Sequence, residues 1–291
     1  MTQMMGAATA LAAALAYSIA VGLQAFEARK VPAQHALRLS LLRRLLPRPL
    51  WITGALVGVV GWSLQAVALM AAPLTLVEPI LATTLIFLVI GSRRLLGEDV
   101  GRREVVGALC VAIGIAGLAV GTPERTAAHS TGAIPIITLA CLAAVVALPH
   151  ARRGRRLSGT LIAASAGVAY AFVALVTKFL ADDVSGGSIP WRSATVWVGL
   201  LAVLGTLGML SEMSALQRWP VSQVAPIVFG LNVALPVILA PAVAGEAWNH
   251  SPAVRTALVV SLAAVVAGVV TLTRSKALVT VLGAEPARRL P

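Results

Sequence analysis

Two stretches of the chain share one pattern of apolar residues, prolines and a final Gly-Glu pair. The first is GWSLQAVALMAAPLTLVEPILATTLIFLVIGSRRLLGE, from Gly61 to Glu98. The second is GMLSEMSALQRWPVSQVAPIVFGLNVALPVILAPAVAGE, from Gly208 to Glu246. Each pattern predicts two apolar helices joined by a turn at a proline. The repeat predicts two homologous halves, and membrane transporters commonly place their binding site between such halves.

Identical or similar residues stand at matching positions in the two copies. The matched pairs are Gln65 with Glu212, Pro73 with Pro220, Pro79 with Pro226 and, after a gap of one residue, Glu98 with Glu246. Upstream of the copies, Tyr17 matches Tyr170, and an alanine precedes each tyrosine. The repeat therefore extends over more of the chain than the two quoted stretches.

The composition is that of a membrane protein. Of the 291 residues, 58% are hydrophobic and 12% are charged, and the mean hydropathy is +0.90. A soluble domain has about a quarter of its residues charged, so this chain has too little charge to cover a water-facing surface. The net charge of +12 does not indicate a nucleic-acid partner, because the basic residues lie in short loops between apolar segments. We expect an all-α polytopic membrane protein in contact with the lipid bilayer.

Nine apolar segments of about 20 residues are each long enough to cross ~30 Å of hydrocarbon as a helix. Nineteen of the 23 lysines and arginines then fall on one side, which predicts an N-terminus outside and a C-terminus in the cytoplasm. The predicted spans are 6–26, 51–71, 74–92, 104–121, 132–149, 159–181, 194–216, 221–243 and 255–273.

The first four predicted helices correspond to the last four, and the odd fifth helix inverts the second set. This predicts an inverted-topology repeat. The first repeat is 1–121, with a basic cytoplasmic loop at 27–50. A connecting helix and a second basic loop occupy 122–158, the second repeat is 159–274, and a cytoplasmic tail follows at 275–291. Within the first loop, 33–46 is either an interfacial helix on the inner leaflet or a solvated basic loop.

Short motifs occur in a fixed order over nearly the whole chain. They are PLW at 49–51, AAPLTLVEP at 71–79, GALC at 107–110, GTPE at 121–124, VTK at 176–178, VAPI at 224–227 and GEAW at 245–248. In order and spacing they resemble the drug/metabolite transporter superfamily, and within it the NIPA-type branch of magnesium transporters. The resemblance implies a carrier of ten helices in two five-helix repeats, with both termini in the cytoplasm.

This chain departs from that pattern in two ways. It has nine predicted spans, and its first runs in the direction of the family's second helix. The family's orientation is therefore kept only if its first helix is absent here. NIPA-type proteins carry Gly-Glu midway along the helix that corresponds to 51–71. Here that position is Gly61-Trp62, and an acidic residue stands instead at Glu78.

Three ionisable residues, Glu78, Lys178 and Glu212, fall inside predicted spans, where such residues are costly and commonly functional. Glu78 and Lys178 lie about one turn from the outer face in opposite halves, and we expect them to share an outer vestibule and to pair. The alternative is that each reaches the headgroups separately, with Asp182 and Asp183 as partners of Lys178.

Glu212 lies near the inner end of the span 194–216. A carboxylate in a low-dielectric interior binds a proton more readily than it does in water, so we expect Glu212 to couple transport to a proton or a cation. The alternative is a carboxylate at the inner interface that contacts Arg218. If the chain carries metal cations, Glu78 or Glu212 is the expected ligand.

Uncharged polar side chains inside the spans need partners within the protein. They either line a substrate pathway or hold helices together. The pathway candidates are Tyr17, Gln65, Tyr170, Ser211, Gln223 and Asn232.

The sequence contains no P-loop, no G-x-S-x-G motif and no His/Cys cluster with metal-ligand spacing. We therefore expect neither an enzyme nor a cofactor. The leading hypothesis is a secondary carrier of a small solute in a plasma membrane, and the arginine-rich composition suggests a bacterial one. The alternatives are a NIPA-like transporter of Mg²⁺ or another divalent cation and a non-transporting scaffold or accessory subunit. A homodimer is possible under each hypothesis.

Overall fold

The structure, a computed structural model, describes residues 2–71, 77, 80–120, 133–152, 157–185, 191–239 and 251–273. Within these ranges every regular element is a helix, so the all-α prediction is confirmed. The elements are α1 (Thr2–Arg29), η1 (Ala33–His35), α2 (Leu39–Leu45), α3 (Pro49–Ala71), α5 (Thr84–Leu95), α6 (Arg102–Val120), α7 (Ala133–Ala151), α8 (Gly159–Ser185), α9 (Trp191–Leu216), α10 (Val221–Leu239) and α11 (Pro252–Thr273).

A helix occupies each of the nine segments predicted to span, and most described ends agree with the predicted ends to within a few residues. The segment 74–92 differs most, because a turn at Thr83 separates the helical residues 80–82 from α5, which begins at Thr84. α10 continues as a helix through Pro226 and Pro236. The apolar periodicity therefore located the helices, but it did not show where one of them is interrupted.

Among the described residues, four helical segments are long and apolar enough to cross a membrane, and α2 with α3, bent by 96°, would make a fifth. Large apolar side chains also cover the outside of the bundle: Trp62, Ile113 and Val196 are each 66% exposed. A water-soluble protein rarely exposes contiguous apolar surface of this extent. Together these features indicate a helical membrane protein whose outer face contacts lipid. The four segments are Met4–Arg29, Gly159–Val176, Thr195–Leu216 and Pro252–Leu272.

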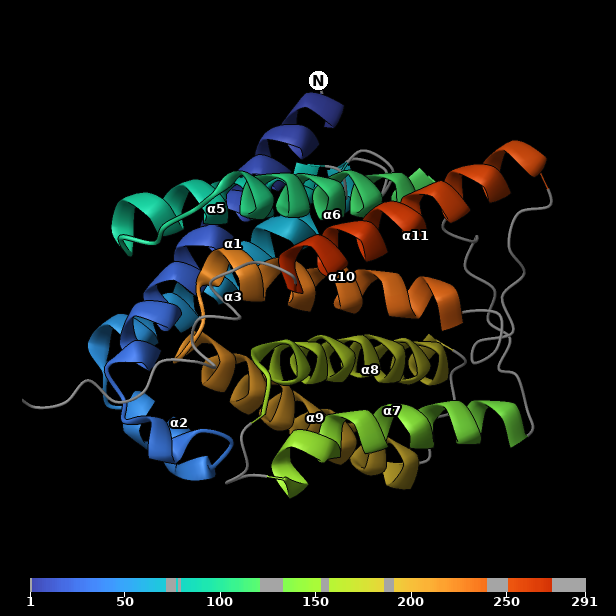
Figure 1. The fold of residues 1–291 in the computed structure, drawn as a ribbon. Coiled ribbons are helices and arrows are strands. Elements are labelled where there is room, and N and C mark those ends of the chain that lie inside the picture. The colour runs from blue at the N-terminus through green and yellow to red at the C-terminus, as the bar shows by residue number, and fades with distance from the viewer. Residues whose placement is uncertain are drawn as a thin grey trace, which may run out of the picture.

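Small residues bring neighbouring helices close together. α1 packs along α3, α6 packs along α11, and α8 packs against both α9 and α10 (Figure 1). A Cβ added to Gly268 would lie 2.6 Å from the carbonyl oxygen of Gly107, and one added to Gly167 would lie 2.9 Å from that of Val228. Such backbone contacts are typical of helix pairs in membranes, where close packing rather than water exclusion drives association.

The basic segment between α1 and α3 is folded against the bundle. It forms η1 and α2, and Leu41 and Leu45 are fully buried while Leu39 is 57% exposed. The Leu37 amide donates a hydrogen bond of 2.7 Å to Ser214 Oγ, and Gln217 Nε2 donates one of 3.1 Å to the carbonyl oxygen of Val31. The segment is therefore fastened to the C-terminal end of α9, which a freely solvated loop would not be.

Candidate functional site

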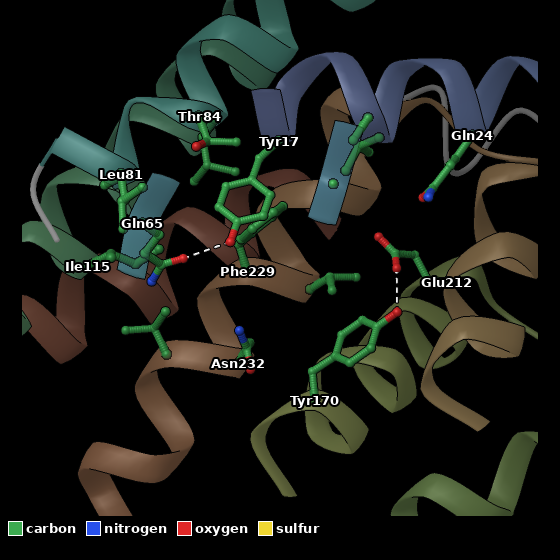
Figure 2. Close-up of a pocket in the computed structure, with 17 residues that line it drawn as sticks. Tyr17, Gln24, Gln65, Leu81, Thr84, Ile115, Tyr170, Glu212, Phe229 and Asn232 are labelled. Atoms are coloured by element: carbon green, nitrogen blue, oxygen red, sulfur yellow. Dashed lines mark hydrogen bonds between the residues drawn. The ribbon is translucent and has the colours of Figure 1, made fainter. Parts of the chain in front are cut away.

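A cavity of about 330 Å³ lies among α1, α3, α5, α6, α8, α9 and α10 (Figure 2). Its walls are mostly apolar, and the polar side chains come from both predicted repeats. Five of the residues predicted to line a pathway lie here: Tyr17, Gln65, Tyr170, Glu212 and Asn232. Gln24 and Thr84 also line it, as do the aromatic ring of Phe229 and apolar residues including Leu81, Leu85, Ile115 and Val228.

Two tyrosine hydrogen bonds reach into the cavity from matched positions. Tyr17 Oη on α1 donates to Gln65 Oε1 on α3 at 2.7 Å. Tyr170 Oη on α8 donates to Glu212 Oε2 on α9 at 2.6 Å. Both bonds are visible in Figure 2. The repeat that pairs Tyr17 with Tyr170 and Gln65 with Glu212 in sequence thus has the same side-chain contact in each half, with an amide in one half and a carboxylate in the other.

A glycine supports each of these tyrosines at matched positions. A Cβ added to Gly61 on α3 would lie 3.2 Å from Tyr17 Cδ1, and one added to Gly208 on α9 would lie 3.1 Å from Tyr170 Cε1. Each tyrosine ring therefore lies directly on the backbone of the helix that carries its acceptor. Gly61 and Gly208 are the first residues of the two repeated stretches, so their presence in both copies has a packing reason.

Glu212 is the only charged residue among the described residues that line the cavity. It is 9% exposed, and only its Oε2 has a hydrogen-bond partner among the described residues. In Figure 2 the other carboxylate oxygen points away from Tyr170. A carboxylate in an apolar interior is costly unless a proton or a cation compensates it. The site can therefore bind either one at Glu212.

Two of the predicted pathway residues lie elsewhere. Ser211 Oγ is 3.1 Å from His150 Nε2 and 3.2 Å from Ser165 Oγ, so it joins α9 to α7 and α8. Gln223 Nε2 donates to Glu104 Oε1 at 3.3 Å, which joins α10 to α6. Both residues are buried and hold helices together, the alternative role that the sequence left open.

The predicted pair of Glu78 and Lys178 cannot be located in the same way. Glu78 lies outside the described residues. Lys178 belongs to α8, but its side chain lies outside the described part of the structure. Their pairing, and Glu78 as a metal ligand, stay predictions. In the described part of the chain, no group of three or more His, Cys, Asp and Glu side chains could hold a metal ion.

Glu98 forms a second buried polar cluster that the sequence reading did not assign to a site. Its carboxylate pairs with Arg29 and accepts hydrogen bonds from the Val221 amide at 2.7 Å and from the Ser222 amide and hydroxyl at 3.2 and 3.1 Å. Gly97, at φ +64°, lets the chain reverse after α5 and directs Glu98 to the N-terminus of α10. The repeated Gly-Glu pair was the available signal, and its second copy, at Glu246, lies outside the described residues.

Glu27 forms a further ion cluster at the end of α1. Its carboxylate contacts Lys30 Nζ at 2.6 Å and an Arg48 guanidinium nitrogen at 2.7 Å. Together with the Arg29–Glu98 pair, it ties the end of α1 to the start of α3 and to the start of α10. These charges lie away from the cavity, since none of them lines it.

Compared with known proteins, the chain matches no family model, no curated protein and no solved structure.

Proposed function

We propose that the chain is a secondary carrier that moves a small solute across its membrane. The cavity between the two tyrosine pairs is the proposed binding site, and alternating access of this cavity to the two sides is the proposed mechanism. One observation carries the proposal: a cavity inside an apolar helical bundle that receives polar side chains from both predicted repeats and has a carboxylate facing into it.

The matched contacts of Tyr17 and Tyr170 support two halves of common origin. Their equivalence is what an inverted repeat of the kind found in secondary carriers would produce. In such carriers the two halves rock about a central site, so residues of both halves must meet there. The motifs that resemble the drug/metabolite transporter superfamily agree with this proposal. The nine-span topology, with the N-terminus outside and the C-terminus in the cytoplasm, belongs to it as well.

Glu212 is the proposed coupling residue. A buried carboxylate that binds a proton in one state and releases it in another links solute movement to the proton gradient. The Tyr170 hydroxyl holds one oxygen of the carboxylate and leaves the other free to the cavity. This arrangement fixes the orientation of Glu212 without neutralising its charge.

A substrate-independent experiment tests alternating access. We would replace Cys110 and Cys141 by alanine and introduce Asn232→Cys, which places one thiol in the cavity. Membrane-impermeant thiol reagents would then be applied to right-side-out and to inside-out vesicles. Ser63→Cys, on an exposed face of α3 that does not line the cavity, is the control for lipid-facing positions.

A carrier should show labelling of Asn232→Cys from both sides, with the control position unlabelled. Changes in pH should shift the ratio of the two rates, because protonation of Glu212 would favour one state. Labelling from neither side, or from one side only at every pH, would contradict the carrier and favour a scaffold or accessory role.

A further inference from the structure

We propose that the solute is a small organic monocation with an ammonium-type group, and that this group binds at Glu212 Oε1. The inference rests on the proposed carrier function, since it names the substrate class of the same cavity. It follows from the charges, donors and rings that the described residues present to that cavity.

The charge of the cavity selects against anions. Glu212 is its only described charged residue, and no lysine or arginine is found among the residues described as lining it. An anionic solute would therefore meet a carboxylate with nothing to neutralise its own charge in a low-dielectric site. A solute with one positive charge instead neutralises the charge of the described lining.

A single carboxylate in the described lining also disfavours a divalent cation. Ca²⁺ takes about six to eight oxygen ligands, and Mg²⁺ takes about six, of which one or two are usually carboxylates and several are waters. Here one carboxylate is available, its Oε2 already accepts the Tyr170 hydroxyl, and Gln65 Oε1 accepts the Tyr17 hydroxyl. With one carboxylate in the described lining, a divalent ion would keep an uncompensated positive charge in a low-dielectric site.

The remaining walls suit an organic body. Phe229, Tyr17 and Tyr170 supply three aromatic rings, and aliphatic side chains line most of the remaining surface. Aromatic faces attract ammonium groups, most strongly where water is excluded. The volume of about 330 Å³ lies at the lower end of the range for small-molecule sites, which limits the solute to a compact molecule.

Because the proton and the monocation would bind the same carboxylate, their exchange would be obligatory. A proton on Glu212 removes the charge that holds the cation, and a bound cation disfavours protonation. The carrier would therefore release one proton for each monocation that it binds. The charge of the loaded site is the same in both cases, so either form can cross between states.

Binding to the purified full-length protein in detergent tests the inference with matched probes. Choline is compared with its uncharged isostere 3,3-dimethylbutan-1-ol and with 3,3-dimethylbutanoate. Benzylammonium is compared with benzyl alcohol and benzoate. Kd is measured by calorimetry, and the change in Tm at saturating probe is recorded beside it. Ser211→Ala is the matched control for Glu212→Gln, because it changes the adjacent buried residue of α9 without touching the cavity.

The expected result is tighter binding of at least one cation than of its neutral analogue, with no binding of either anion. Glu212→Gln should weaken cation binding by about 10- to 100-fold, the effect of losing a hydrogen bond or contact to a charged group. Ser211→Ala should leave it within about threefold. Acidification should weaken choline binding to the unmodified protein, a readout that needs no variant and that choline's own permanent charge cannot cause.

Preference for a neutral or anionic probe, or equal binding within both sets, overturns the inference. Its failure is distinct from failure of the carrier function. Alternating access with uptake of a neutral solute would sustain the carrier and refute the monocation. Glu212-dependent binding of choline or benzylammonium without access from both sides would sustain the monocation site and refute the carrier.

Discussion

The hydroxyl of Tyr170 donates a 2.6 Å hydrogen bond to one oxygen of Glu212, and this contact joins the middle of α8 to α9 at the cavity. Its counterpart in the other half, from Tyr17 to Gln65, has nearly the same length but ends on an amide. The two contacts therefore share a tyrosine donor and differ in the charge of the acceptor. That difference gives the cavity a single ionisable acceptor among its described residues, and several consequences can be tested.

Replacement of Glu212 by glutamine should abolish the pH dependence of transport. The new side-chain amide would keep an oxygen for the Tyr170 hydroxyl, so the helix pair should survive while the proton site is lost. The flux of choline or benzylammonium into proteoliposomes is measured over a series of internal and external pH values. Ser211→Ala should retain the pH dependence of the unmodified protein. If Glu212→Gln transports with an unchanged pH profile, the coupling role is wrong.

Gly208 should be needed for the Tyr170–Glu212 contact. An added Cβ would lie 3.1 Å from both the Ala169 Cβ and the Tyr170 ring, a distance that forces the ring to move. Gly208→Ala should therefore weaken Glu212-dependent binding and lower the Tm.

Gly205, three residues earlier on α9, provides the control for this variant. A Cβ at Gly205 would meet nothing within 4 Å. Gly205→Ala should leave binding unchanged, and it should stabilise the helix by about 0.5–1 kcal/mol in the absence of other effects. Equal effects of the two substitutions would show that the glycine does not position the tyrosine.

The sequence predicted the helices well because long apolar runs and basic loops are local signals. It could not predict which way each side chain points, because an apolar helix in lipid has no polar face to mark its rotation. Ser211 and Glu212 show the difference: they are adjacent on α9 and both polar, yet successive residues of a helix point about 100° apart. Ser211 therefore forms a hydrogen bond with His150, and Glu212 lines the cavity.

The Glu98 cluster was missed for another reason. Its residue lies in a loop after α5, and a charged loop residue ordinarily needs no structural partner. Its significance depends on a contact with Val221, which is 123 residues away, and no local pattern reports such a distance. The repeated Gly-Glu pair marked the position as important without indicating what it touches.

Loss of the Glu98 carboxylate should destabilise the protein. Glu98→Ala would remove the ion-pair partner of Arg29, whose other hydrogen bond goes to the Leu216 carbonyl oxygen, and would leave the amides of Val221 and Ser222 without their acceptor. The expected cost is about 2 kcal/mol or more, because the carboxylate is buried and its donors would stay buried. Thermal unfolding in detergent should show a lower Tm.

The neighbouring Asp99 provides the control for Glu98. Asp99 is exposed, and Asp99→Asn should change the Tm little. If both variants unfold at the temperature of the unmodified protein, the Glu98 cluster does not hold the start of α10.

Moving the carboxylate from one half to the other should restore the cavity's function. The single variant Glu212→Gln is expected to bind monocations about 10- to 100-fold more weakly. Adding Gln65→Glu returns one carboxylate to the cavity, now beside the hydroxyl of Tyr17, which already donates to residue 65. Because the cavity's total charge is unchanged from the original, choline or benzylammonium should bind within about tenfold of its original affinity, roughly the difference made by one hydrogen bond.

The single variant Gln65→Glu changes the charge of the cavity without removing Glu212. Gln65→Glu alone would give two carboxylates, and like charges in one apolar site raise the cost of ionising both. This variant should therefore bind dications such as 1,4-diaminobutane better than the unmodified protein does, and calorimetry at neutral pH would detect the change. If the exchanged double variant binds no monocation although its Tm is normal, the two tyrosine pairs are not functionally equivalent. The single carboxylate would then matter for its place on α9 rather than for its charge alone.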